Sequence, residues 1–134
     1  MKLAESTCRA RFAGARVARL ATADEGQPHL VPVTFAVADD ELFIAVDHKP
    51  KTTTNLRRLR NIAANPAVTL LVDHYDEDWT QLWWVRADGV ARVLDTAPAA
   101  VALLVAKYPQ YQANPPTGPV IAVRVDRWSG WAFA

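Results

Sequence analysis

The amino-acid sequence predicts a mainly β protein: a closed or nearly closed β-barrel of six or so antiparallel strands with flanking helices, in one domain over residues 1–134. Six segments carry the apolar or alternating pattern of strands, and most connections between them are short, which favours antiparallel pairing. So many apolar strands would expose their edges in an open sheet, and closure removes those edges. A composition of 51% hydrophobic and 22% charged residues is ordinary for a soluble globular chain of this length.

The first half of the chain is expected to contain a short helix followed by three strands. The second of these strands alternates clearly, with Val31, Val33 and Phe35 on one face. Gly26 marks the turn before it, and Asp39 with Asp40 marks the turn after it. In chain order, the expected elements are a helix over residues 3–14, strands over 16–22, 29–37 and 41–46, and turns over 23–28 and 39–40.

The second half is expected to contain three more strands and a second amphipathic helix. Residues 67–73 are nearly continuously apolar, which is typical of a buried strand. The next strand, over 81–94, is long, and Asp88-Gly89 predicts a bulge within it. A helix over 96–108, a proline-rich loop over 110–118, a last strand over 119–127 and an aromatic tail over 128–133 complete the chain.

A basic segment between the third and fourth strands is the clearest functional signal. Five of the fifteen Lys and Arg residues fall within residues 49–60, and no acidic residue occurs between 49 and 72. A helix is expected here: one of Thr52, Thr53 and Thr54 would cap it, and Asn65-Pro66 would end it. The apolar face comprises Leu56, Leu59, Ile62 and Ala63, and the opposite face comprises Thr54, Arg57, Arg58 and Asn61, with Arg60 near the edge.

This arrangement of charge and hydroxyl groups predicts an anion site. A phosphate needs positive charge and several directed donors, and a helix N-terminus adds free N–H groups and a favourable dipole. The alternative is a solvated helix face, which a charge run often is.

Five tryptophans are many for a small domain. The adjacent Trp83 and Trp84 point to opposite sides of their strand, so at most one of them faces the barrel interior. The other needs a lid, a ligand or a partner subunit to cover it.

Several classes of function are disfavoured by the sequence. The three histidines and Cys8 lack the spacing of metal ligands, and no glycine-rich nucleotide fingerprint is present. The balanced charge and the lack of aromatics within the basic run argue against nucleic acid. No apolar run spans a membrane, no signal peptide is apparent, and a single cysteine suits a reducing cytoplasm.

The whole series of motifs resembles a known family. In one uninterrupted order across about residues 12–127, the matching segments are VARLAT (17–22), GQPHLVPV (26–33), LFIAV (42–46), RLRNI (58–62), NPAVTLLVD (65–73), DEDW (76–79) and WVRADGVA (84–91). They resemble the pyridoxamine 5′-phosphate oxidase-like split β-barrel proteins, which share the fold of FMN-binding proteins. They especially resemble the small actinobacterial branch that uses the deazaflavin coenzyme F420.

This resemblance implies a homodimer with a flavin or deazaflavin in a groove between two barrels. It also implies phosphate contacts from the basic segment and ring contacts from the second strand. The lysine of the family motif falls on Arg58 here, which keeps the charge and adds a bidentate fork. The cofactor-binding residues expected from the resemblance and the basic segment are Pro32, Val33, Thr34, Lys49, Lys51, Thr53, Arg57, Arg58 and Asn61, with Trp79 and Trp84 as the pocket wall.

The resulting hypothesis is an F420-dependent oxidoreductase that passes a hydride between F420H2 and a small organic substrate. F420 carries carboxylates beyond its phosphate, and Lys49 and Lys51 supply charge for them. FMN is the alternative cofactor, and a non-catalytic F420-binding carrier is the alternative function. We expect a cytoplasmic homodimer without nucleic-acid, membrane or metal partners; no catalytic residue is assigned.

Overall fold

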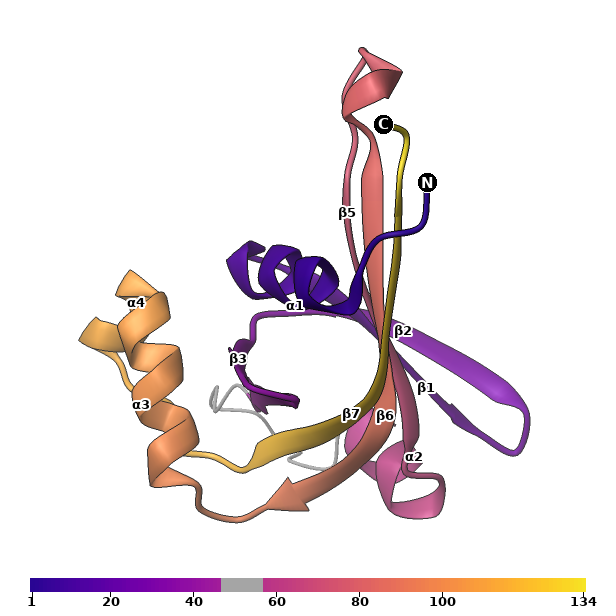
Figure 1. Cartoon of the computed structure of the whole chain (residues 1–134). Helices are drawn as coiled ribbons and strands as arrows, with labels where there is room; N and C mark the ends of the chain where they lie inside the picture. The colour runs from indigo at the N-terminus through magenta and orange to yellow at the C-terminus, as the bar shows by residue number, and fades with distance from the viewer. Residues whose placement is uncertain (47–56) are drawn as a thin grey trace.

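The computed structural model describes residues 1–46 and 57–134. Within these ranges the chain forms a seven-stranded antiparallel sheet in the order β2-β1-β5-β6-β7-β4-β3, flanked by helices (Figure 1). The predicted mainly β class is therefore confirmed. The elements are α1 (Glu5–Gly14), β1 (Ala18–Asp24), β2 (Gln27–Val33), β3 (Ala36–Ala38), β4 (Glu41–Ala45), α2 (Arg57–Ala64), β5 (Ala67–His74), the 3-10 helix η1 (Trp79–Gln81), β6 (Trp83–Leu94), α3 (Pro98–Lys107), α4 (Pro109–Ala113) and β7 (Val120–Ala132).

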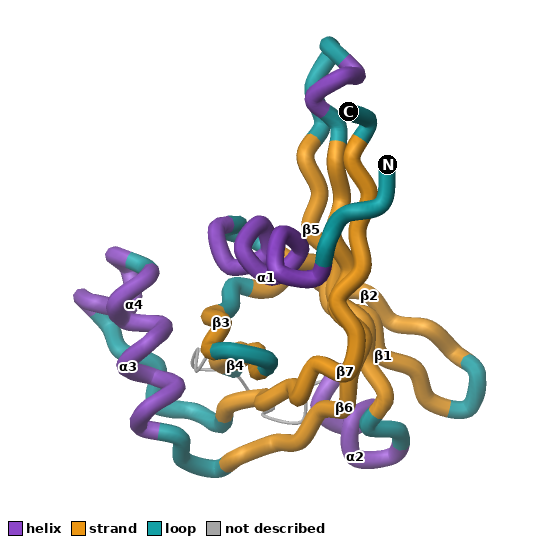
Figure 2. The backbone as a smooth tube through the Cα atoms, viewed as in Figure 1, coloured by secondary structure: helices purple, strands orange, loops and turns teal. Residues whose placement is uncertain are grey.

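The sheet curls into a barrel because its two outermost strands are consecutive in the chain. β2 and β3 stand at opposite ends of the strand order, yet only Thr34 and Phe35 separate them. In Figure 2 the chain passes from β2 through a short loop into β3, beside which β4 lies. The strand expected over residues 29–37 is thus two strands with a corner between them.

The barrel interior is filled by apolar side chains, and α1 lies across one opening. The fully buried ones include Phe12, Leu20, Phe35, Leu42, Ile44, Leu70, Ile121 and Val123. From α1, the ring of Phe12 meets Phe35 at 5.1 Å and Trp128 at 5.4 Å between centroids, both edge-on. Burying each such side chain contributes about 1.5–3 kcal/mol, so this cluster fixes α1 on the barrel.

β6 bends at a bulge, as predicted. Its register with β7 shifts between Asp88 and Gly89. A Cβ atom at Gly89 would lie 2.2 Å from the carbonyl oxygen of Arg124, far inside contact distance. Glycine is therefore what lets the two strands approach here.

Two tight turns also match the prediction. Glu25 and Gly26 join β1 to β2, both with positive φ (52° and 77°), and Asp39 has a φ of 52° between β3 and β4. Such left-handed backbone favours Gly and tolerates Asp, so these residues end their strands locally.

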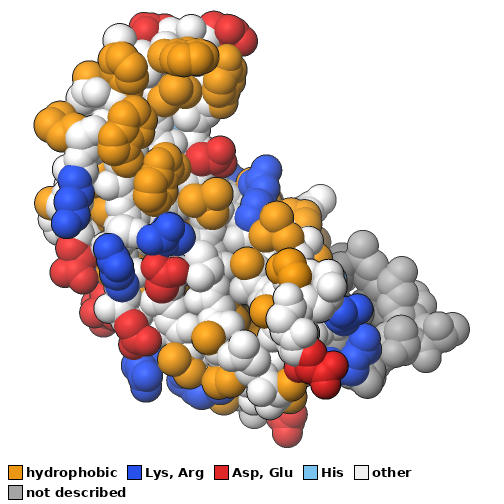
Figure 3. Space-filling model, turned by 90° about the vertical axis from the view of Figure 1, so that its right-hand side faces the viewer, with side chains coloured by type: hydrophobic (Ala, Val, Ile, Leu, Met, Phe, Trp, Pro, Cys, Tyr) orange, Lys and Arg blue, Asp and Glu red, His pale blue; other side chains and the backbone are white. Residues whose placement is uncertain are grey.

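Strands β5, β6 and β7 extend beyond the barrel as an arm that ends at η1, with both chain termini beside it (Figure 1). The predicted aromatic tail over 128–133 was wrong, because β7 continues to Ala132 and pairs Trp131 with Trp84. The strand continues because Trp128, Gly130 and Ala132 alternate inward and are buried. Hydrophobic side chains gather on one face of this arm (Figure 3).

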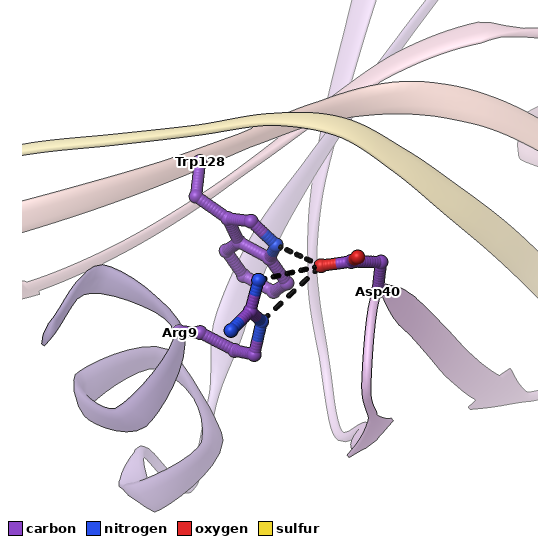
Figure 4. A network of polar contacts seen from close by, with 3 residues as sticks. All are labelled: Arg9, Asp40 and Trp128. Carbon is purple, nitrogen blue, oxygen red and sulfur yellow. Dashed lines mark hydrogen bonds and ion pairs between the residues drawn. The ribbon is translucent and has the colours of Figure 1, made fainter. Parts of the chain in front are cut away.

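A polar network ties α1 to the barrel end near Trp128. Oδ1 of Asp40 accepts hydrogen bonds from Nε1 of Trp128 (2.9 Å) and from Nε and Nη2 of Arg9 (3.2 and 2.9 Å) (Figure 4). The Trp128 bond first, and the Arg9 guanidinium second, lower the pKa of Asp40. The three residues come from the β3–β4 turn, β7 and α1, so the network links three distant parts of the chain.

The proline-rich loop expected over 110–118 was wrong in its first part. Pro109 opens the short helix α4, which packs beside α3. Proline suits the first turn of a helix because the N–H it lacks has no partner there.

Candidate functional site

A pocket of about 510 Å³ lies where the end of β2, strand β4, α2 and α4 meet. Buried apolar side chains of Val33, Ile44 and Ala45 form part of its wall. Arg58 is the sole charged residue among the described residues of the lining, so the pocket favours an anionic group. The full lining is Pro32, Val33, Thr34, Ile44, Ala45, Arg58, Tyr108, Gln110, Tyr111 and Asn114.

Four of the predicted cofactor-binding residues therefore come together. Pro32, Val33 and Thr34 end β2, and Arg58 stands 24 residues later at the start of α2. Pro32 lies on an edge strand, where it faces Arg19 of β1. Proline suits this position, because it has no N–H to donate to a neighbouring strand.

The corner after β2 is fixed by Tyr108. Its hydroxyl accepts a hydrogen bond from the Phe35 N–H (3.1 Å) and lies within donating distance of the carbonyls of Arg16 (2.9 Å) and Phe35 (3.1 Å). Burial raises the pKa of Tyr108, so the hydroxyl stays protonated and can donate. Tyr108 thereby turns Thr34 out of the sheet and toward the pocket.

On α2, the predicted outer face was wrong at Asn61. Arg57 and Arg60 are exposed and Arg58 is half-buried, but Asn61 is only 1% exposed. Its Nδ2 donates to Oγ1 of Thr22 on β1 at 3.0 Å. The side chains of Asn61 and Thr22 are both buried and hydrogen-bond to each other. A prediction that places every polar residue on the exposed face of a helix does not anticipate such a pair. A contact of Asn61 with a cofactor stays a prediction, as does one for the exposed Arg57.

Three further predicted contacts lie outside the described residues: Lys49, Lys51 and Thr53. The same holds for the helix cap expected at 52–54. These remain predictions.

Neither predicted wall tryptophan lines this pocket. Trp79 belongs to η1 at the end of the arm and is 60% exposed, well away from α4 (Figure 1). Trp84 is half-buried on β6 with the guanidinium of Arg86 5.7 Å from its ring centroid. Its neighbour Trp83 packs against the core, so the expected division of this pair between two faces is observed. Roles for Trp79 and Trp84 at a site stay predictions.

The wall formed by α4 and its two flanking residues was not predicted from the sequence. Tyr108, Gln110, Tyr111 and Asn114 line the pocket, and the Tyr111 hydroxyl lies 2.9 Å from Oγ1 of Thr34. The spacing of Tyr108 and Tyr111 around Pro109 could have indicated this wall, because residues three apart at the start of a helix lie on the same side of it.

Two negative findings apply to the described part of the chain. No three His, Cys, Asp or Glu side chains within residues 1–46 and 57–134 are grouped so that they could hold a metal ion. Among the same residues, no helix has the length and apolar character needed to cross a bilayer.

Comparison with known proteins identifies relatives over the whole chain. The family model described as pyridoxamine 5′-phosphate oxidase matches residues 4–132. A FAD-binding protein from Mesorhizobium loti has the same fold, with a TM-score of 0.74, 22% identity, and coverage of 97% of this chain and 95% of that one. A FAD-binding protein from Mycobacterium smegmatis gives a TM-score of 0.68 at 20% identity, with coverage of 100% and 99%.

A third similar structure, a conserved protein of unknown function from Corynebacterium diphtheriae, is 25% identical with a TM-score of 0.70 and coverage of 100% and 98%. A search of curated proteins found no match.

Proposed function

The chain belongs to the pyridoxamine 5′-phosphate oxidase family, and from this premise we propose that it is an oxidoreductase that binds a flavin-type cofactor in the pocket between β2, β4, α2 and α4. The observation that carries the proposal is the meeting of Pro32, Val33 and Thr34 with Arg58 in that one pocket. Two proteins of the same fold are FAD-binding, which supports a flavin-type ligand.

The residues present fit such a ligand. Arg58 offers a charge-assisted, two-pronged donor to a phosphate. Val33, Ile44 and Ala45 offer an apolar surface that a planar ring can cover, which excludes water from it. The bound cofactor would supply the hydride chemistry, while the protein binds it, orients it and keeps water away.

We propose F420 as the cofactor, with FMN as the alternative. The basic segment over residues 49–60 is wider than one phosphate needs, and the carboxylates of F420 would use the additional charge. The resemblance to the actinobacterial F420 branch supports the same choice. The substrate would be a small organic molecule, and the lone, buried Cys8 suits a cytoplasmic location.

We propose further that the protein is a homodimer. Tyr75, Trp79, Trp131 and Phe133 on the arm are 63%, 60%, 37% and 49% exposed. Aromatic surface of this kind is costly to leave in water, and a second copy of the chain would cover it. Sedimentation analysis tests this: we expect a dimer, and a monomer across the micromolar range contradicts the proposal.

The cofactor site is tested by a matched pair of charge reversals on α2. Arg58→Glu replaces a pocket-lining donor with a group that repels phosphate, while Arg60→Glu makes the same change at an exposed residue outside the described lining. Loss of one charged contact costs about 1.5–3 kcal/mol, so F420 affinity should fall at least tenfold for Arg58→Glu and stay near wild type for Arg60→Glu.

Circular dichroism must show both variants folded. Equal, unchanged affinity would mean that the basic run is a solvated face. Loss at Arg60→Glu alone would place the phosphate on the other side of α2.

An enzyme and a carrier would both bind F420, but only the enzyme would turn over F420H2 with a substrate. Oxidation of F420H2 in the presence of a panel of enones, quinones and tetrapyrroles supports the enzyme. Tight F420 binding without turnover on any of them favours the carrier.

A further inference from the structure

Besides the charged Arg58, the lining of the pocket carries a pair of neutral hydroxyl groups. Oγ1 of Thr34 and the hydroxyl oxygen of Tyr111 are 2.9 Å apart, and both residues line the pocket. Thr34 belongs to the corner after β2, whereas Tyr111 comes from α4, 77 positions later. The pair therefore forms only when α4 is docked on the barrel.

The pair has more protons than its own hydrogen bond uses. Two hydroxyls carry two protons, and their mutual hydrogen bond uses one, whichever atom donates it. No acceptor for the second proton occurs among the described residues. Tyr108 differs, because its single proton is directed at the backbone carbonyls of Arg16 and Phe35. The Thr34–Tyr111 pair thus keeps one O–H to donate to a ligand, and Tyr108 does not.

Packing holds the pair in position. The rings of Tyr108 and Tyr111 meet edge-on with centroids 5.7 Å apart, and both pack against the buried Ala36, Ala45 and Leu104. Tyr108 is in turn anchored to the corner that carries Thr34. A donor fixed before the ligand arrives loses little entropy on binding, which makes it selective for acceptor position.

We propose that the Thr34–Tyr111 pair is a donor subsite for a carbonyl oxygen of a planar conjugated ligand. The pair is uncharged and has one proton to give, which suits a neutral oxygen acceptor, while the anionic group goes to Arg58. This inference rests on the proposed function. The carbonyl belongs either to the cofactor ring or to a quinone-like or enone substrate beside it.

Removing the donor requires the loss of both hydroxyl groups, because either one left alone keeps its own proton. The double variant Thr34→Val/Tyr111→Phe deletes both oxygens and nearly keeps the shapes of the two side chains, so it decides the question. Thr34→Ser retains the hydroxyl and should bind the ligand with nearly wild-type affinity. Gln112→Ala, on an exposed residue of α4 outside the pocket lining, is the surface control.

The experiment has two arms. The first measures the dissociation constants of FMN and of F420, and the second measures that of menadione for the cofactor-loaded protein. Loss of one neutral hydrogen bond should weaken binding about 3- to 10-fold in one arm for the double variant Thr34→Val/Tyr111→Phe, with Thr34→Ser and Gln112→Ala within about twofold of wild type. Loss in the first arm assigns the carbonyl to the cofactor, and loss in the second assigns it to the substrate.

Unchanged constants in both arms, for the folded double variant Thr34→Val/Tyr111→Phe, overturn the donor subsite and leave the proposed function standing. A wild-type protein that binds neither FMN nor F420 overturns both.

Discussion

Replacing Tyr108 with phenylalanine should destabilise the protein through the corner between β2 and β3. The lost hydroxyl leaves the N–H of the fully buried Phe35 without its acceptor, and the carbonyls of Arg16 and Phe35 without a donor. An unsatisfied buried donor costs about 1–3 kcal/mol and a lost hydrogen bond about 0.5–1.5 kcal/mol. We therefore expect Tyr108→Phe to lower the free energy of unfolding by about 2–4 kcal/mol.

The assay is urea denaturation followed by tryptophan fluorescence, with Tyr111→Phe as the control. That variant loses a single bond to a hydroxyl beside an open pocket, where water can replace it, so its cost should stay near or below about 1 kcal/mol. Equal urea midpoints for the two variants, at equal slopes, would refute the claim that Tyr108 holds this corner.

Three other perturbations have predictable outcomes. Gly89→Ala should shift the urea midpoint down strongly, because its Cβ would lie 2.2 Å from the Arg124 carbonyl oxygen; a wild-type midpoint would contradict the bulge geometry. Burial lowers the pKa of Lys107 to about 8 in the folded protein. Between about pH 8 and 10.5 the unfolded chain therefore binds more protons than the folded one, so the free energy of unfolding should rise with pH in this range. Lys107→Met should remove that rise. The pKa of Asp40 is lowered in the folded protein, so its carboxylate contributes to the free energy of unfolding at neutral pH and loses that contribution in the acid range below about 4. Asp40→Asn can still accept a hydrogen bond from Trp128, and it should weaken the dependence of stability on pH in that acid range.

Most of the barrel could be predicted because strand signals are local. Alternation and apolar runs located the strands, and Gly26, Asp39 and Gly89 marked two turns and a bulge where the structure has them. The corner at Thr34 and Phe35 could not be predicted, because the alternation of side chains typical of a strand continues across it in the sequence. A long-range contact with Tyr108 makes that corner, and no local pattern encodes such a contact.

The candidate site was predictable only in part, for a related reason. The meeting of Pro32–Thr34 with Arg58 followed from a family resemblance rather than from periodicity. Asn61 was predicted on the exposed face of the helix, but its side chain is buried. Its hydrogen-bond partner, Thr22, is 39 residues away in the sequence, so no local pattern indicates the contact. Tyr111 was overlooked because its hydroxyl matters only once α4 packs beside Thr34.

Equilibrium titration of the purified protein with F420 and, separately, with FMN tests the central claim most directly. Quenching of tryptophan fluorescence reports binding, and phosphate-free riboflavin shows how much of the affinity depends on the anionic end. We predict saturable binding of F420 at micromolar concentrations, weaker binding of FMN, and much weaker binding of riboflavin. Micromolar binding of FMN with none of F420 would contradict the F420 assignment, and binding of neither would contradict the account as a whole.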